Sequence, residues 1–280
     1  MLAAVGLFAL MDAGLKLLSA HYPPLQVAAL RGGASLPFVL SWALMTVGAR
    51  SLFRVRWPLH LLRAVLGIAM MMMFVYALRT LPLTTAYTIF FIAPLLITAL
   101  SVPILGERVG PRRWSAIVVG FVGVLVVLRP TGEGIGSLAG LAVLLAALGY
   151  ALSAITVRVL ARTDSSQSIV VWLLASMAFG AGLLALPHWV PIQRAELWLI
   201  AGIGIAGALG QYTITEAFRQ GEASLIAPLE YSALLWGLLL DFSLWGVLPD
   251  GITWIGAAVI VLSGLYLLRR ERVHLEAEHP

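Results

Sequence analysis

LLRAVLGIAMMMMFVYALR, residues 61–79, and AGIGIAGALGQYTITEAFR, residues 201–219, are apolar segments that lie 140 positions apart. Each is close to the roughly 20 residues that a helix needs to cross about 30 Å of hydrocarbon. A shift of 140 positions also superposes matching residues: Gly67 on Gly207, Ala77 on Ala217, Arg79 on Arg219, Gly106 on Gly246, and Leu128-Arg129 on Leu268-Arg269. This self-similarity predicts two related halves, residues 1–140 and 141–280.

Each half contains five apolar segments of membrane-spanning length. We expect helices at 2–20, 25–47, 61–79, 83–105, 114–129, 138–160, 168–187, 197–218, 224–246 and 252–269. Proline and glycine punctuate them, as in Tyr22-Pro23-Pro24 and Pro249-Asp250-Gly251. Because five is odd, the second half must enter the membrane from the opposite side. The expected fold is an all-α membrane protein of ten transmembrane helices in two inverted five-helix repeats, a pattern typical of secondary transporters.

The composition agrees with a chain embedded in lipid. It is 61% hydrophobic and 11% charged, whereas soluble domains carry about 25% charged residues. The chain has a net charge of +5, and its basic residues lie in short loops beside apolar segments. We therefore expect the lipid bilayer as partner and no nucleic acid. The absence of cysteine excludes disulfides and thiolate metal sites. Residues 2–20 are not expected to be a cleaved signal peptide, because Asp12 and Lys16 interrupt their apolar core.

Lysine and arginine are distributed unevenly between the two predicted membrane faces. Thirteen lie on one face: Arg50, Arg54, Arg56, Arg63, Arg108, Arg112, Arg113, Arg158, Arg162, Arg219, Arg269, Arg270 and Arg272. Four lie on the other face: Lys16, Arg79, Arg129 and Arg194. The positive-inside bias therefore predicts cytoplasmic N and C termini. The membrane itself, a bacterial inner membrane, is an expectation that goes with the family resemblance described next.

Several motifs resemble one transporter family. The first half carries Tyr76-Ala77-Leu78-Arg79, Ala86, Pro94, Gly106-Glu107-Arg108, Trp114, Gly120 and Gly123, and the second half Glu216-Ala217-Phe218-Arg219, Gly246, Trp254-Ile255-Gly256 and Gly264. This pattern resembles the EamA-like exporters of the drug/metabolite transporter superfamily, and Ser224 through Ser232 is similar to their aromatic amino-acid exporter branch. The resemblance implies export of aromatic or hydrophobic amino acids by alternating access. Val247 stands where the family has an acidic residue, so we interpret Glu107 as a structural loop carboxylate.

Ionisable residues within the predicted helices are candidates for substrate binding, because each costs about 2.5–3.5 kcal/mol on insertion scales. Asp12 and Lys16 lie one turn apart in the first span, and Arg31 lies in the second. Two interpretations remain open: a neutralised cluster that ties two helices together, or a site for a charged amino or carboxylate group. Glu230 is either a structural carboxylate or the group that couples transport to protons, and Asp241 is expected to be solvated or paired.

Aromatic residues form the second group of candidates. Stacking on planar ligands suits Tyr76, Tyr87, Trp172, Tyr212 and Tyr231, although interfacial anchoring or packing is the alternative for each. Gln211 could add a hydrogen bond. One methionine of 70–73 must face inward, and Pro94, Pro103 and Pro228 are candidate bends. The predicted substrate site thus comprises Asp12, Lys16, Arg31, Tyr76, Tyr87, Trp172, Gln211, Tyr212, Glu230 and Tyr231.

Other functions are less well supported. Gly202 through Gly207 matches G-x-G-x-x-G, but it lies in an apolar span with no preceding strand, so we expect helix packing and no dinucleotide. The histidines are expected in loops or the tail, which argues against intramembrane hydrolysis, and no catalytic residue, cofactor or metal is predicted. A channel would need a selectivity filter of oxygen-rich loops or rings of charged side chains. The sequence shows neither pattern, so a channel is not expected. The alternative substrates are drugs or sugar-phosphate-like anions.

Overall fold

The computed structural model describes residues 2–105, 111–128, 137–220, 232–259, 261, 262 and 265, and the regular elements in these ranges are helices. The α-helices are α1 (Leu2–Ser19), α2 (Pro24–Thr46), α3 (Ala49–Phe53), α4 (Trp57–Leu78), α5 (Leu83–Phe90), α6 (Ala93–Leu105), α7 (Pro111–Leu128), α8 (Leu138–Leu160), α9 (Ser166–Ala175), α10 (Gly182–Ala185), α11 (Leu197–Gln220) and α13 (Ala233–Leu240). Two π-helical turns, η1 (Ser176–Ala181) and η5 (Asp241–Trp245), and two 3-10 turns, η2 (Leu186–His188) and η3 (Arg194–Glu196), complete the labelled elements. Residues 251–259 are also helical.

Seven helical stretches in the described ranges are long and apolar enough to cross a membrane. They are Leu2–Ser19, Pro24–Thr46, Trp57–Leu78, Leu83–Ile104, Leu138–Leu160, Ser166–His188 and Arg194–Ile214. These stretches confirm seven of the ten predicted spans to within a few residues. α7 coincides with the predicted fifth span, and Ala233–Trp245 covers the described part of the ninth. The inverted arrangement of ten helices stays a prediction.

Two predicted helix boundaries were wrong. α4 begins at Trp57, four residues before the predicted start, because Pro58 near its first turn has a φ suited to a helix start. His60 therefore lies in a helix and not in a loop. The predicted fourth span is divided: α5 ends at Phe90 and α6 begins at Ala93, since Pro94 has no N–H to continue the helical bonding. Pro103 lies inside α6, and Pro228 lies outside the described residues.

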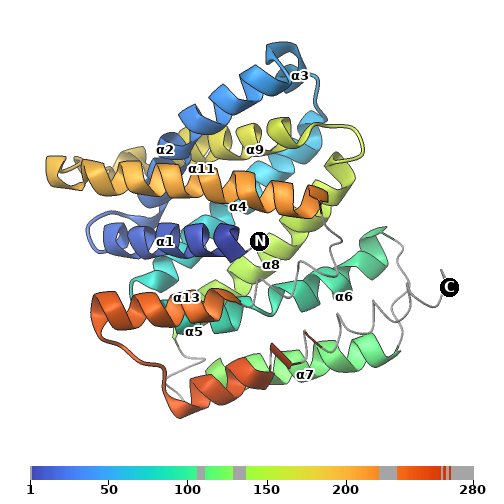
Figure 1. Ribbon diagram of the computed structural model, residues 1–280, viewed down its shortest axis with the longest axis vertical. Helices are drawn as coiled ribbons and strands as arrows, with labels where there is room; N and C mark the ends of the chain where they lie inside the picture. Colours follow the sequence, from blue (N-terminus) through green and yellow to red (C-terminus); the bar gives the residue numbers. More distant parts are fainter. Residues whose placement is uncertain are drawn as a thin grey trace.

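Small residues let the helices approach closely around α1 and α2. α1 lies between α11 and α13, and α2 packs on both α11 and η1 (Figure 1). A Cβ added to Gly204 would lie 2.6 Å from the Ala34 carbonyl oxygen, and one added to Gly32 would lie 2.6 Å from the Ala178 nitrogen. The predicted packing role is therefore confirmed for Gly204, and Gly32 packs in the same way. The prediction is wrong for Gly202, which has open space beside it.

The two π-helical turns carry buried side chains. η1 interrupts the helix that begins with α9 and places Met177 in the core, and η5 follows α13 and buries Asp241. Gly246 ends η5 with φ of +65°, the left-handed conformation that glycine adopts most easily at a helix end. Such π-turns are rare in proteins, and those that occur often lie at functional sites.

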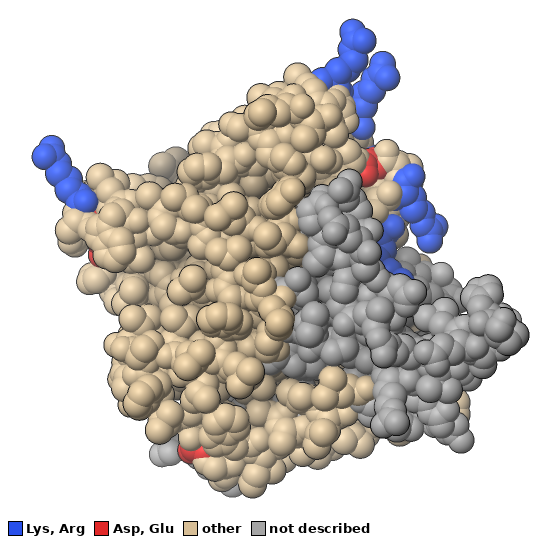
Figure 2. All heavy atoms as spheres, in the orientation of Figure 1, with Lys and Arg blue, Asp and Glu red and all other residues tan. Residues whose placement is uncertain are grey.

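Charged residues concentrate at one end of the molecule. Figure 2 shows most of the visible lysines and arginines at the end that carries α3, and a single one at the opposite end. The exposed arginines of the α3 end are Arg50, Arg54, Arg56, Arg158 and Arg162. The rest of the visible described surface is almost free of charge, as expected of a surface that faces lipid.

Candidate functional site

The candidate site is a polar network buried among α1, α2, α5 and η5. Asp12 of α1 accepts a hydrogen bond of 2.9 Å from the Tyr87 hydroxyl of α5. The Tyr87 ring lies nearly parallel to Phe74, with 6.5 Å between ring centroids. A Cβ on Gly237 would be 2.9 Å from the Tyr87 ring, so this glycine lets the backbone of α13 approach the aromatic face. The network thus combines a carboxylate with an aromatic wall.

Asp241 is the centre of a second part of this network, and it is only 1% exposed. Its carboxylate accepts the backbone N–H groups of Leu83 and Thr84, at 3.0 and 2.8 Å, and the Thr84 hydroxyl at 2.9 Å. Pro82, which precedes α5, forms no side-chain cap, so Asp241 caps that helix from the other half of the chain. The expectation that Asp241 is paired is confirmed, and the alternative of solvation is wrong.

Lys16 completes this part of the network. Its Nζ lies 3.5 Å from Asp241 Oδ1 and 4.4 Å from the centre of the Trp245 ring. The charge of Lys16 is therefore matched by a carboxylate and by an aromatic face within contact distance. The sequence signal that could have identified Asp241 is its position as an ionisable residue inside an apolar span.

Arg31 lies in a different environment. Its side chain is buried, and its Nε and Nη1 groups point to the sulfurs of Met11 and Met177, at 3.2 and 3.4 Å. Thioether sulfur is a weak acceptor. Arg31 interacts electrostatically with Asp12, but none of the ion pairs among the described residues includes Arg31. Ser35, one turn further along α2, is also buried, and its hydroxyl has no hydrogen-bond partner among these residues.

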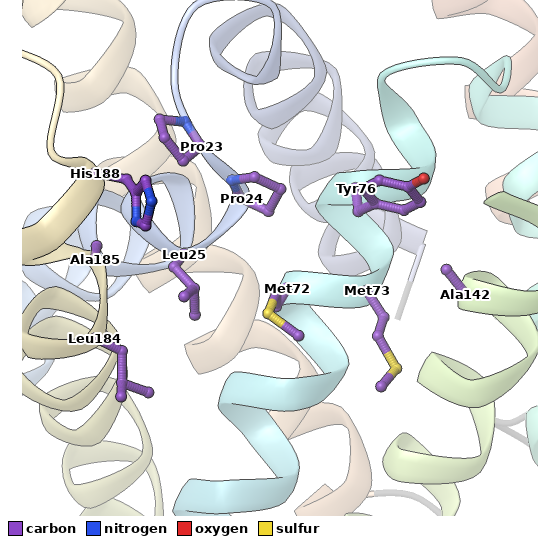
Figure 3. Close-up of a pocket in the computed structure, with 10 residues that line it drawn as sticks. All are labelled: Pro23, Pro24, Leu25, Met72, Met73, Tyr76, Ala142, Leu184, Ala185 and His188. Carbon is purple, nitrogen blue, oxygen red and sulfur yellow. The ribbon is translucent and has the colours of Figure 1, made fainter. Parts of the chain in front are cut away.

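Tyr76 belongs to a separate, apolar pocket of about 330 Å³. The pocket lies where α2, α4, α8 and α10 meet, and Figure 3 shows Met72 and Met73 of α4 between Leu25 and Ala142. Tyr76 is 41% exposed there and is not part of the Asp12 network. Of the four methionines at 70–73, Met71 is the one buried in the core, as the sequence pattern predicts for at least one of them.

Trp172 and Tyr212 are placed away from the network by contacts of their own. The Trp172 indole N–H donates to the Leu52 carbonyl at 2.7 Å, and its ring meets Trp57 edge-on at 4.7 Å. Tyr212 meets Trp42 in a similar way, with 5.4 Å between ring centroids. Gln211, beside Tyr212 on α11, is half-buried. Of the predicted site residues, the structure brings together Asp12, Lys16, Arg31 and Tyr87, while Glu230 and Tyr231 lie outside the described residues.

A buried polar pair joins α4 to the α8–α9 connection at the α3 end. His60 Nε2 lies 2.9 Å from Asp164 Oδ2, and Asp164 also accepts the Arg56 N–H at 3.1 Å and the Thr163 hydroxyl at 2.7 Å. Burial acts to raise the pKa of Asp164, but these hydrogen bonds outweigh it and hold that pKa below its usual value. The pair links the first turn of α4 to the α8–α9 connection. No sequence pattern pointed to this pair.

The opposite end is held by the α1–α2 connection. Gln26 exchanges two hydrogen bonds with the backbone of Val190, at 2.6 and 2.9 Å. The Tyr22 hydroxyl accepts the Gln193 N–H at 3.0 Å, and Arg79 donates to the Tyr22 carbonyl at 2.7 Å. These contacts fasten the segment between η2 and η3 to the start of α2. Both ends of the molecule are thus tied by polar contacts, with the buried network between them.

Comparison with known proteins adds to this geometry. The EamA-like transporter family matches residues 1–129 and 137–269. A riboflavin transporter of Vibrio cholerae is 31% identical over 89% of this chain and 84% of its own length, and one of Rhizobium johnstonii is 33% identical over 85% and 77%. A pseudopaline exporter of Pseudomonas aeruginosa is 27% identical over 95% of this chain and 93% of its own. A solved crystal structure, 22% identical, superposes with a TM-score of 0.65 over 96% of this chain and 98% of the other, which supports the fold alone.

Proposed function

Because the chain belongs to the EamA-like transporter family, we propose that it moves small amphipathic metabolites across a bacterial inner membrane by alternating access. The substrate site in this proposal is the polar network of α1, α2, α5 and η5. The expected direction is export. The relatives include proteins named for both directions: the pseudopaline exporter and an S-adenosylmethionine uptake transporter of Rickettsia prowazekii, 28% identical over 87% of this chain and 81% of its own.

The observation that carries the proposal is the gathering of Asp12, Lys16 and Arg31 within two apolar helices, together with Asp241. Charged groups inside membrane helices are costly, and they generally mark a substrate or ion pathway. Tyr87 connects this cluster to an aromatic wall that includes Phe74. A ligand with a planar ring and a charged group would find complementary partners there.

The proposed topology has two inverted halves with both termini in the cytoplasm. The two separate family matches support the halves, since their boundary lies close to residue 140. The concentration of exposed arginine at the α3 end supports a cytoplasmic location for that end. Alternating access would then require the contacts of His60 with Asp164 and of Gln26 with Val190 to open in turn.

Two substrate classes fit this site. Aromatic amino acids follow from the resemblance of Ser224 through Ser232 to that exporter branch, and riboflavin follows from the names of two relatives. Both present a planar ring to an aromatic wall. A sugar-phosphate-like anion fits less well, because Lys16 is already paired with Asp241 and Arg31 alone remains for two or more charges. A drug with a planar ring remains the alternative.

We also propose that transport is coupled to protons. Glu230 and Asp12 are the candidate proton carriers, since the sequence predicts both carboxyl groups within membrane-spanning segments. If Glu230 carries the proton, Glu230→Gln abolishes acceleration by a pH gradient and leaves passive exchange intact. Unchanged gradient dependence in this variant would exclude Glu230, and the same test applied to Asp12→Asn would then decide whether Asp12 has that role.

The experiment that tests the proposed function is counterflow in proteoliposomes. Labelled phenylalanine, tryptophan and riboflavin are each offered to vesicles loaded with the same unlabelled compound, with and without a pH gradient. Saturable counterflow of any of them supports the transporter. Arg54→Gln, on the exposed α3 end, is the matched control for charge removal away from the network. Absence of flux with all three compounds would contradict the proposed substrate classes.

A further inference from the structure

Arg31 is a buried cation with weak hydrogen-bond acceptors. A guanidinium has five N–H donors arranged as a rigid fork that matches a carboxylate. Among the described residues its hydrogen-bond acceptors are two thioether sulfurs, Asp12 acts on it electrostatically, and only 9% of the residue is exposed. A buried guanidinium whose donors meet only weak acceptors is costly. The side chain is therefore in an environment that an anion would improve.

Ser35 supplies a second, independent observation at the same place. It follows Arg31 by four residues on α2, so the two side chains share one face of the helix. Its hydroxyl is buried, with 1% of the residue exposed, and it has no hydrogen-bond partner among the described residues. Buried polar groups are hydrogen-bonded in the great majority of native structures, so this hydroxyl requires an explanation.

Met11 relates the two groups to each other, near the position where Gly207 lacks a side chain. A Cβ built on Gly207 would lie 2.8 Å from Ser35 Oγ and 3.1 Å from Met11 Sδ, and that same sulfur accepts from Arg31 Nε. Met11 thus contacts the guanidinium and lies beside the same Gly207 position as the Ser35 hydroxyl. Because methionine is flexible, rotation of the Met11 and Met177 side chains would release the Arg31 donor groups.

We propose that Arg31 and Ser35 form the receptor for a carboxylate group of the transported substrate. This inference rests on the proposed function and narrows it to substrates that combine a planar apolar part with a carboxylate. The guanidinium would hold the carboxylate through two parallel hydrogen bonds, and the Ser35 hydroxyl would donate a third. Lys16 does not bind the carboxylate in this proposal, because it is already paired with Asp241. Asp12 balances the charge of Arg31 when the site is empty.

The test compares each acid with its amide. Half-saturation concentrations are measured by counterflow for phenylalanine and phenylalaninamide, and for tryptophan and tryptophanamide, with riboflavin as a planar compound that has no carboxylate. A hydrogen bond to a charged group corresponds to roughly a tenfold to hundredfold change in affinity. The unmodified protein should therefore prefer each acid over its amide by at least about tenfold.

Variants then assign the preference to the two residues. Arg31→Gln should remove the preference for the acid, and Ser35→Ala should reduce it about threefold. Arg63→Gln is the matched control, since Arg63 is a buried arginine that donates to the Ile169 carbonyl, outside the proposed receptor. It should keep the full preference. Arg31→Lys retains the charge and loses the fork, so an intermediate preference is expected.

Three results would overturn the inference. They are equal transport of acid and amide by the unmodified protein, an undiminished preference in Arg31→Gln, and transport of riboflavin alone. Riboflavin counterflow with no amino-acid flux would leave the proposed transporter function intact, so the two failures are distinguishable. The comparison within the unmodified protein needs no variant, and therefore it decides the question even if Arg31→Gln does not fold.

Discussion

Lys16 and Arg31 are two cations at membrane depth on neighbouring helices, and their surroundings differ. Lys16 meets a carboxylate that is itself fixed by two backbone N–H groups and a hydroxyl. Arg31 meets two sulfurs and lies near a hydroxyl that has no partner in the described structure. The charge of Lys16 thus has a strong partner, whereas the donors of Arg31 have only weak acceptors among the described residues. We infer that Lys16 stabilises the fold, whereas Arg31 binds the substrate.

The largest effect is expected from Asp241→Asn, which disrupts the environment of Lys16. The substitution leaves Lys16 without a charge partner and weakens the cap of α5. Removing one member of a buried ion pair typically costs about 3–5 kcal/mol. Thermal unfolding in detergent should therefore show a large loss of stability. Part of that loss should return in the double variant Lys16→Met/Asp241→Asn, which removes the uncompensated charge.

Asp250→Asn is the matched control for this prediction. Asp250 accepts the Thr253 N–H at the start of the helix at 251–259, so it also caps a helix, but it lies exposed. Its loss should cost roughly 1 kcal/mol, as for other helix caps. Equal effects of the two substitutions would show that the Lys16–Asp241 pair contributes little to stability.

Gly207→Ala should disturb the environment of Arg31. A methyl group there would lie 2.8 Å from the Ser35 oxygen, so it would crowd the proposed carboxylate site, and overpacking of this kind costs about 1–3 kcal/mol. We expect a lower melting temperature and a weaker preference for acids over amides. Gly202 lies on the same helix with open space beside it, so Gly202→Ala should lower neither the melting temperature nor the preference for acids. A normal acid preference in Gly207→Ala would argue that the receptor lies elsewhere.

Asp164→Asn should have a smaller and pH-dependent effect. The native hydrogen bonds lower the pKa of Asp164, so its contribution is present above the pKa of the unfolded chain, about 4, and is lost as the pH falls through the folded-state pKa. We expect a loss of about 1.5 kcal/mol at pH 7. The difference in melting temperature between variant and parent should shrink below about pH 4. A difference that is the same at all pH values would contradict this account.

The smallest effect is expected from Trp172→Phe. The indole N–H donates to the Leu52 carbonyl, and the ring packs against Trp57, so the structure gives this side chain a packing role. Loss of one hydrogen bond should cost roughly 1 kcal/mol, with no change in the half-saturation concentration for any substrate. A large change in that concentration would support the sequence-based prediction that Trp172 contacts substrate.

The predicted helices depended on hydropathy and on proline and glycine, and these signals are strong because lipid requires every backbone group to be satisfied within a helix. Seven spans were located correctly for this reason. The sequence did not reveal η1 and η5, because a π-turn depends on how a helix packs against its neighbours. α3 and the early start of α4 were missed, because the residues that form them are too few and too polar for a hydropathy signal.

The predicted site also has a part that the sequence could indicate and a part that it could not. That Asp12, Lys16, Arg31 and Tyr87 belong together could be anticipated, since ionisable and aromatic residues in apolar helices tend to gather. Their pairing could not, because Asp241 reaches α5 from more than 150 residues away. Trp172 and Tyr212 have the residue type expected of a cavity lining, but neighbouring helices direct them elsewhere. Tyr76 does line a cavity, but it is the separate apolar pocket. Ser35 gave no sequence signal, because serine is common in membrane helices.

The measurement that tests the central claim most directly uses a single thiol at the proposed receptor. The chain has no cysteine, so Ser35→Cys provides a unique thiol four residues from Arg31. Its labelling by an anionic and by a cationic methanethiosulfonate reagent is measured with and without substrate. We predict faster labelling by the anionic reagent, protection by phenylalanine but not by its amide, and loss of both effects when Arg31→Gln is added. Equal labelling by the two reagents, or equal protection by acid and amide, would contradict a carboxylate receptor at Arg31.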